Sequence, residues 1–519
     1  MASPVTDQRS VTEKRLVCIG FMGAGKSTAA RSLAEALGTE AIDVDGVVER
    51  ALGKPIERVF AEDGEAVFRA AEEQVTLELL SRPDAGVLAL GGGAITHERV
   101  RAALRSHTVL WLDVALDLAW TRCRDSGRPL AREREQFERL YRRREPLYAE
   151  TADATVPAER SNRMEPVIAA LENLPADTRL LWATSASADY PAYIGAGLVT
   201  KHHFWPRGVP GRRFLVTDGN AGRLYGEFLE PLAARIRIMP GEQSKTIAHA
   251  EIVWTELVRA GMTRADVVVA LGGGVVGDLA GFCAATYQRG VRYVQVPTTL
   301  VAQVDSAYGG KTGVDLAEAK NYVGAYHQPA AVIADTGALD TLPAPELAAG
   351  YAEVVKSALI AGGELWESIR AGADPATPEL ITACVRSKLR VVARDERDGG
   401  SRQVLNLGHT VGHAIETASG YARYRHGEAV ALGLLAALRL SGQDQLRDEV
   451  RDLLAGRGLP TELDGVDPDA VVMATARDKK RLGDGPVPFV LLDGPGEPRS
   501  GCTVATRDLI AAVRELSPQ

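Results

Sequence analysis

The chain has 519 residues, 45% of them hydrophobic and 25% charged, and its net charge of −8 argues against a main role in binding nucleic acid or anionic membranes. Its length predicts about three domains. The five cysteines are scattered without a C-x-x-C pair, which indicates neither disulfides nor a cysteine zinc site and fits a cytoplasmic protein. No apolar run reaches the ~18 residues of a membrane span.

The first part of the chain alternates short apolar runs with an amphipathic segment. Residues 1–14 are expected to form a loose tail. Runs at 15–19, 87–90 and 109–112 predict strands, and the apolar stripe within 26–37 predicts a helix. Strands that alternate with helices indicate a parallel α/β sheet with helices on both faces.

The composition changes near residue 175, and a second series of elements follows. We expect strands at 214–217, 266–271 and 292–296, and then helices at 345–360, 378–394, 408–419 and 428–441, with a short helix at 167–174 before the change. The predicted organisation is a first domain over 1–174, a linker over 175–185, a Rossmann-like α/β part over 186–334 and a mainly helical part over 335–519.

Residues 20–27, with the sequence GFMGAGKS, match the P-loop pattern in full between a predicted strand and a predicted helix. Small residues let backbone N–H groups surround phosphates at the positive end of the helix. Lys26 would reach the β- and γ-phosphates, and the Ser27 hydroxyl would bind Mg²⁺. The motif therefore predicts a nucleotide and Mg²⁺ site made by Gly23, Ala24, Gly25, Lys26, Ser27 and Thr28.

Five further motifs follow the P-loop in order: DVD at 43–45, FRAAE at 68–72, GGGA at 91–94, RPL at 128–130 and REPLY at 144–148. With the P-loop, this set resembles the shikimate kinases, although one leucine follows Pro129 where two are common. The resemblance implies ATP-dependent 3-phosphorylation of shikimate, with ATP and Mg²⁺ as cofactors. It implies shikimate binding by Asp45, Arg69, Gly92 and Arg144, catalysis by Asp45, Lys26 and a lid residue, Arg128, and a magnesium shell that includes Ser27 and Asp43.

Residues 272–278, GGGVVGD, contain a G-x-G-x-x-G turn after a predicted strand. Alone this is a weak dinucleotide signal, and no convincing acidic residue follows ~20 positions later as an ordinary Rossmann unit requires. Asp218, at the end of an earlier predicted strand, is the alternative partner for a ribose.

Histidines cluster in the helical part. His409 and His413 share a helix face at i, i+4, and His426 follows shortly afterwards, so three of the nine histidines fall within a short window. Glu353 and Lys356 lie at i, i+3 on another predicted helix. Two histidines and one glutamate with an open position are typical of a catalytic zinc site.

The second half as a whole resembles the 3-dehydroquinate synthases, through segments at 240–245, 272–278, 297–299, 305–312, 320–321, 353–356, 405–413, 426–429 and 478–480. Ala319 stands where glycine is usual. The resemblance implies zinc, or cobalt in its place, on Glu353, His409 and His426. It implies NAD binding by Asp218, Asn220, Glu242, Lys245, Gly273, Gly274, Asp278, Thr298, Thr299, Lys311 and Lys320. It implies substrate binding by Arg289, Asp305, Lys311, Asn321, Lys356, Arg402, Asn406, His413 and Lys479 or Lys480, with Asp305, Lys311, Lys356 and His413 catalytic.

The implied reaction converts 3-deoxy-arabino-heptulosonate 7-phosphate into 3-dehydroquinate and phosphate, with NAD reduced and reoxidised in each cycle. The resemblance also implies small-molecule substrates and a homodimer formed through the synthase half. Two alternatives remain: a metal-dependent polyol dehydrogenase that consumes NAD, and a non-catalytic nucleotide-sensing scaffold. The many predicted cationic ligands argue against the first, since a polyol has no anions to pair, and the intact motifs argue against the second.

Overall fold

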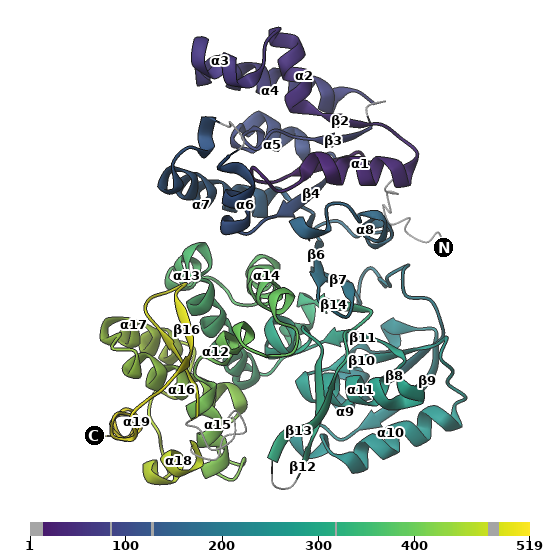
Figure 1. The fold of residues 1–519 in the computed structure, drawn as a ribbon. Helices are drawn as coiled ribbons and strands as arrows, with labels where there is room; N and C mark the ends of the chain where they lie inside the picture. The colour runs from purple at the N-terminus through teal and green to yellow at the C-terminus, as the bar shows by residue number, and fades with distance from the viewer. Residues whose placement is uncertain (1–13, 84–85, 126–128, 317–318, 476–486, 519) are drawn as a thin grey trace. The chain divides into compact units, whose positions relative to one another are not determined.

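The computed structural model describes residues 14–83, 86–125, 129–316, 319–475 and 487–518 (Figure 1). The chain divides into two compact units. The first comprises Met1–Ala183 with Pro191–Tyr193 and Phe204–Gly208. The second comprises Thr184–Tyr190, Ile194–His203 and Val209–Gln519.

The first unit is built on a parallel sheet with the strand order β2-β3-β1-β4-β5-β6. The central strand β1 is wholly buried, as expected for a parallel sheet covered on both faces. The predicted strands and their parallel arrangement are confirmed. The strands are β1 (Leu16–Ile19), β2 (Ala41–Asp43), β3 (Val87–Ala89), β4 (Thr108–Asp113), β5 (Ala154–Pro157) and β6 (Arg179–Thr184).

The helix after the P-loop, α1 (Lys26–Leu37), has the predicted limits, because Gly38 ends it in the left-handed conformation. The last helix of the unit, α8 (Glu165–Leu171), ends three residues before the predicted limit. Within the segment expected to be a linker, the structure has strand β6, which pairs with β5. The remaining helices are α2 (Val44–Leu52), α3 (Ile56–Glu62), α4 (Glu65–Ser81), α5 (Glu98–Leu104), α6 (Leu116–Cys123) and α7 (Arg134–Thr151).

The second unit contains a parallel sheet with the order β14-β11-β10-β8-β9. The chain leaves β8 for β9 on one side and returns to β10 on the other, so the carboxyl ends of β8 and β10 flank a topological switch point, where ligands bind in such sheets. The strands of this unit are β8 (Arg213–Asp218), β9 (Leu232–Ile238), β10 (Val267–Gly272), β11 (Arg292–Pro297), the hairpin β12 (Lys311–Leu316) and β13 (Ala319–Tyr326), and β14 (Ala331–Asp335); β7 (Asp189–Gly195) is shared between the two units.

Helices dominate the chain after β14, as the sequence predicts, and a small two-stranded sheet completes the unit (Figure 1). The helices of this unit before β14 are α9 (Gly219–Tyr225), α10 (Ile247–Arg259) and α11 (Gly274–Thr286). The elements after β14 are α12 (Ala344–Ala361), α13 (Gly363–Arg370), α14 (Pro378–Arg394), α15 (His409–Ala418), α16 (His426–Leu440), α17 (Asp444–Ala455), α18 (Pro468–Thr475), α19 (Thr506–Arg514), β15 (Phe489–Leu492) and β16 (Pro498–Cys502). In the described part of the chain, no helix is both long and apolar enough to cross a membrane. The five cysteines are free thiols.

Candidate functional sites

The P-loop connects β1 to α1 and presents backbone N–H groups to an anion. Gly23 and Gly25 have φ angles of 76° and 83°, which side chains rarely adopt. No side chain caps the start of α1, and its first turn holds no acidic residue. Lys26 Nζ donates to the carbonyl oxygen of Phe21 at 3.2 Å, which holds the ammonium beside the loop. The arrangement of residues 23–28 therefore fits nucleotide phosphates.

Two oxygen-bearing side chains meet beside this loop. Ser27 Oγ, at the start of α1, donates to Asp43 Oδ2 at 2.5 Å, and Asp43 Oδ1 accepts from the Asp45 N–H at 3.1 Å. The last bond fixes the Asp43 carboxylate because it caps helix α2. Hydroxyl and carboxylate oxygens are ligands that Mg²⁺ prefers, so this pair fits a magnesium ion.

The glycine triplet that follows β3 lies against three charged side chains. A Cβ atom on Gly91 would lie 2.3 Å from Glu72 Oε1 and 2.6 Å from Asp45 Oδ1, and one on Gly93 would lie 1.8 Å from Arg69 Nη1. Only glycine lets these three side chains approach the strand end. Arg69 Nη1 donates to the buried Glu72 carboxylate at 2.6 Å. Sequence analysis assigned Glu72 no role, because a single glutamate on a helix resembles a surface residue.

Arg144, from α7, approaches the same glycine triplet. Its guanidinium is buried, and Nη1 donates to the Gly92 carbonyl oxygen at 3.1 Å, which also accepts from Tyr148 Oη at 2.6 Å. Within the described residues, Arg144 Nε has no hydrogen-bond partner. Arg69, Arg144 and Asp45 thus lie around the same glycine triplet, and the two cations fit a small anionic molecule. Arg128, the predicted lid residue, lies outside the described residues.

The G-x-G-x-x-G turn in the second unit joins β10 to α11. A Cβ atom on Gly273 would lie 3.0 Å from Thr299 Cγ2, and one on Gly274 would lie 3.0 Å from Ser306 Oγ. The N–H of Thr298 donates to the Gly272 carbonyl oxygen at 3.0 Å, so the two strand ends are held together. The start of α11 has neither a capping side chain nor an acidic residue in its first turn. This cradle fits a dinucleotide pyrophosphate.

Charged residues predicted to contact NAD form a network beside the turn. Lys245 Nζ lies 2.8 Å from Asp278 Oδ2 and 3.7 Å from Glu242 Oε1, and Lys320 Nζ lies 3.6 Å from Glu242 Oε1. Burial disfavours the charge on Lys245, but Asp278 and Glu242 outweigh it and raise the pKa of its ammonium. At the end of β8, Asp218 Oδ1 accepts from the N–H groups of Asn220 and Ala221 and caps α9.

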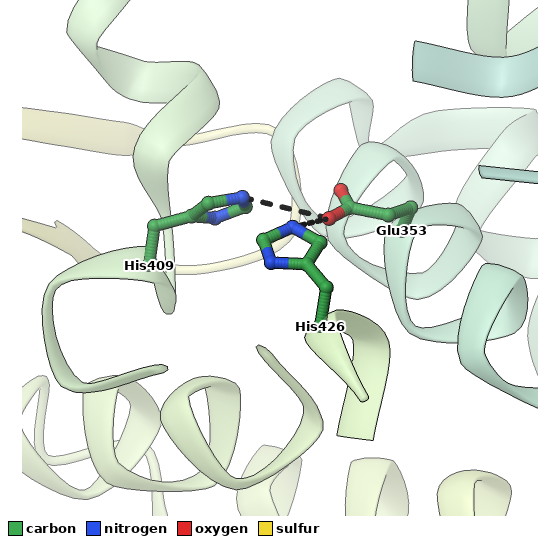
Figure 2. Close-up of side chains that lie close together, drawn as sticks. All are labelled: Glu353, His409 and His426. Atoms are coloured by element: carbon green, nitrogen blue, oxygen red, sulfur yellow. Dashed lines mark ion pairs between the residues drawn. The ribbon is translucent and has the colours of Figure 1, made fainter. Parts of the chain in front are cut away.

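Three helices bring Glu353, His409 and His426 together, and Figure 2 shows their side chains pointing toward one another. Glu353 Oε1, from α12, lies 3.5 Å from Nε2 of His409 and 3.3 Å from Nε2 of His426. Zinc bonds of ~2.0–2.1 Å in a tetrahedral site place neighbouring ligand atoms about 3.3 Å apart. His409 Nδ1 lies 3.2 Å from the Leu407 carbonyl oxygen, which leaves Nε2 for a metal. The three residues therefore fit a zinc or cobalt ion.

The electrostatics of this cluster also fit a cation. Burial opposes ionisation of Glu353, but Lys356 and the two histidines outweigh it and hold the pKa of Glu353 well below its usual range. Burial would lower the pKa of His426, but the carboxylates of Glu353 and Glu416 overcome it and raise the pKa to about 10. A divalent cation bound here would displace that proton.

A second cluster of cations lies beside the metal-ligand set. Lys356 Nζ is 2% exposed and lies 2.5 Å from Glu353 Oε2 and 2.6 Å from Asp305 Oδ2. Lys388, from α14, donates to the carboxylate of Asp305 and, at 2.6 Å, to its carbonyl oxygen. Burial, opposed by Asp305, lowers the pKa of Lys388 to about 8. Sequence analysis missed Lys388. Its place between buried Val385 and Leu389 on α14 is a signal that could have found it.

The other predicted substrate ligands lie in varied settings. Arg402 is buried and donates to the carbonyl oxygens of Gly309, at 3.0 Å, and Glu396. Lys311 Nζ lies 2.5 Å from Asp398 Oδ2. The N–H of Asn321 donates to Asp315 Oδ1 at 2.7 Å.

The remaining predicted substrate ligands are less closely tied to the cluster of Lys356, Lys388 and Asp305. Asn406 ends the 3-10 helix Ser401–Asn406, and the His413 ring centre lies 5.3 Å from that of His409. Arg289 is exposed after α11, and none of the described ion pairs of this cluster includes it. Lys479 and Lys480 lie outside the described residues.

The fold and the sites define a P-loop phosphotransferase unit followed by a dinucleotide- and metal-binding unit. Residues 22–174 match the family model "Shikimate kinase", and residues 235–349 and 350–481 match the N-terminal and C-terminal models of 3-dehydroquinate synthase. The chain is 46% identical over 332 residues to the 3-dehydroquinate synthase of Symbiobacterium thermophilum, covering 59% of this chain and 92% of the relative. The chain belongs to the 3-dehydroquinate synthase family and carries a shikimate kinase domain before the synthase domains.

Two solved structures are similar to the synthase part. One is 2-deoxy-scyllo-inosose synthase with carbaglucose-6-phosphate, NAD⁺ and Co²⁺, with a TM-score of 0.59, 27% identity and coverage of 65% of this chain and 99% of that one. The other is the 2-epi-5-epi-valiolone synthase of Streptomyces hygroscopicus subsp. jinggangensis with NAD⁺ and Zn²⁺ bound. Its TM-score is 0.55, with 28% identity and coverage of 59% and 91%.

Proposed function

We propose that this chain is a bifunctional enzyme of the shikimate pathway. Its first unit phosphorylates shikimate at the 3-hydroxyl with ATP. Its second unit converts 3-deoxy-arabino-heptulosonate 7-phosphate into 3-dehydroquinate and phosphate. The observation that carries the second assignment is the metal-ligand trio with the Lys356, Lys388 and Asp305 cluster beside it, since an anionic substrate next to a metal needs buried cations.

In the kinase unit, the P-loop N–H groups and Lys26 bind the ATP phosphates. When bound at Ser27 and Asp43, Mg²⁺ neutralises charge on the β- and γ-phosphates. Arg69 and Arg144 bind the shikimate carboxylate, and Asp45 orients the attacking hydroxyl and accepts its proton. Support comes from the glycine triplet, which places Asp45 and Arg69 against the same strand end.

In the synthase unit, Glu353, His409 and His426 hold the zinc or cobalt ion, and the turn at 273–274 holds the NAD pyrophosphate. When bound, NAD⁺ accepts and returns a hydride, and the metal polarises the alcohol that is oxidised. Lys356, Lys388, Arg402 and Lys311 pair with the phosphate and carboxylate of the substrate. His413, with its ring next to that of His409, moves protons at the reacting hydroxyl.

The tests are two assays of the full chain. Formation of ADP that requires shikimate, and that is lost in Lys26→Met, supports the kinase assignment. Formation of 3-dehydroquinate by protein loaded with zinc or cobalt, and its loss on metal removal, supports the synthase assignment. Accumulation of NADH on a polyol such as glycerol would favour the dehydrogenase alternative instead.

We also propose that the chain forms a homodimer through the synthase half and works in the cytoplasm, which its five free thiols support. Sedimentation equilibrium tests the first point. The expected mass is twice that of the 55.4 kDa chain, and a monomer at micromolar concentration would refute the dimer.

A further inference from the structure

Glu416, on α15, is a buried carboxylate that the proposed reaction does not use. It is 3% exposed, and a buried carboxylate is stable only when it is paired. Its two oxygens face different partners. Oε2 lies 3.6 Å from Nδ1 of His426, and Oε1 lies 3.2 Å from Nζ of Lys320. One side chain therefore contacts both a metal ligand and a predicted NAD ligand.

Glu416 contacts Nδ1 of His426, which is not the ring nitrogen that lies next to Glu353. Nε2 of His426 points at Glu353 Oε1, and Nδ1 points at Glu416. A carboxylate beside the Nδ1–H of a metal-binding histidine fixes the tautomer and the ring orientation and makes Nε2 a better ligand. Glu416 is therefore placed to orient His426 without binding the metal itself.

The contact with Lys320 leads toward the cofactor cradle. Lys320 Nζ also lies 3.6 Å from Glu242 Oε1, and Glu242 lies 3.7 Å from Lys245, which pairs with Asp278 on α11. A continuous series of ion pairs thus runs from Glu416 to the helix that begins at the G-x-G-x-x-G turn. Lys320 comes from the β12–β13 hairpin, whereas Glu416 comes from the helical part of the same unit.

We propose that Glu416 is a positioning residue that couples metal binding to NAD binding, an inference that rests on the proposed synthase function. Bound NAD holds Lys320 in place, and Lys320 in turn fixes Oε1 of Glu416. The other oxygen of the Glu416 carboxylate then holds the His426 ring with Nε2 directed at the metal. Because binding equilibria are reciprocal, the metal strengthens NAD binding by the factor by which NAD strengthens metal binding.

The test measures Co²⁺ affinity of the full chain, from the visible absorption of bound Co²⁺, with and without saturating NAD⁺ and without substrate. In the unmutated protein NAD⁺ raises the affinity about 5-fold or more. Glu416→Gln keeps the side-chain shape but removes the charge. It lowers the affinity without NAD⁺ by about 10- to 100-fold, as expected for the partner of a metal-binding histidine, and abolishes the effect of NAD⁺.

Two further variants distinguish a positioning role of Glu416 from a general loss of structure. Lys320→Met, studied at an NAD⁺ concentration that saturates it, removes the effect of NAD⁺ on Co²⁺ affinity, and without NAD⁺ it lowers the affinity less than Glu416→Gln does, because Glu416 still contacts His426. Glu396→Gln is the matched control, because Glu396 is a buried carboxylate that instead accepts from Ser187 and Gln328. It keeps both the affinity and the effect of NAD⁺.

An effect of NAD⁺ that persists in Glu416→Gln, or a Co²⁺ affinity equal to that of unmutated protein, would overturn the inference. So would an unmutated protein that binds both ligands independently. These outcomes leave the proposed function intact, since both ligands still bind. Unmutated protein that binds no Co²⁺ at all would overturn both.

Discussion

Replacing Lys356 with methionine removes a buried cation that separates two carboxylates. Lys356 Nζ lies 2.5 Å from Glu353 Oε2 and 2.6 Å from Asp305 Oδ2. Breaking a buried ion pair from one side costs about 3–5 kcal/mol of unfolding free energy. Asp305 keeps Lys388, and Glu353 keeps the histidines, so we expect the lower end, about 3 kcal/mol. A zinc ion on Glu353 replaces the lost charge, so the loss shrinks when the metal is bound.

The assay is thermal and urea unfolding of the full chain, in a zinc-selective chelator and in excess Zn²⁺. Lys201→Met is the matched control, because this lysine of the same unit is exposed, and it changes stability by less than about 0.5 kcal/mol. A loss below about 1 kcal/mol in the chelator, or an equal loss with and without Zn²⁺, would refute the electrostatic reasoning, since breaking a buried pair costs more.

Three further predictions concern single features of the two sites. Above pH 8 the kcat/KM of the synthase reaction falls, because Lys388, with a pKa of about 8, loses its charge as the pH rises through that value. Lys388→Arg removes this decline, and a decline that persists in that variant would show that Lys388 does not cause it. Gly93→Ala places a Cβ atom 1.8 Å from Arg69 Nη1 and raises the KM for shikimate about tenfold or more, while synthase activity on the same chain stays constant; an unchanged KM would show that Arg69 does not bind shikimate. A zinc-selective chelator in excess Mg²⁺ abolishes 3-dehydroquinate formation but leaves shikimate-dependent ADP formation; equal loss of both activities would count against separate metal sites.

The P-loop and its helix could be predicted from the sequence because their signals are local. The motif at 20–27, the apolar stripe and Gly38 all act over a few residues, so α1 has the predicted limits. Strand β6 was missed because its flanks are polar and its burial depends on pairing with β5, far away in the sequence.

The metal site could be predicted in part. Spacing alone showed that three histidines cluster but not which pair faces the glutamate. The fold brings His409 and His426 next to Glu353, whereas His413 lies close to Glu416 and His426. Burial of single charged residues on helices, such as Glu72 and Glu416, is set by tertiary packing. Local pattern cannot separate such residues from a solvated surface.

The most direct test of the central claim counts phosphate released per NAD. The full chain, loaded with Zn²⁺, is given excess 3-deoxy-arabino-heptulosonate 7-phosphate and NAD⁺ equimolar with the protein, and absorbance of NADH is followed alongside. We expect many phosphates per NAD⁺ with no net NADH, because the hydride returns in each cycle. NADH that accumulates in proportion to turnover, without phosphate release, would contradict it.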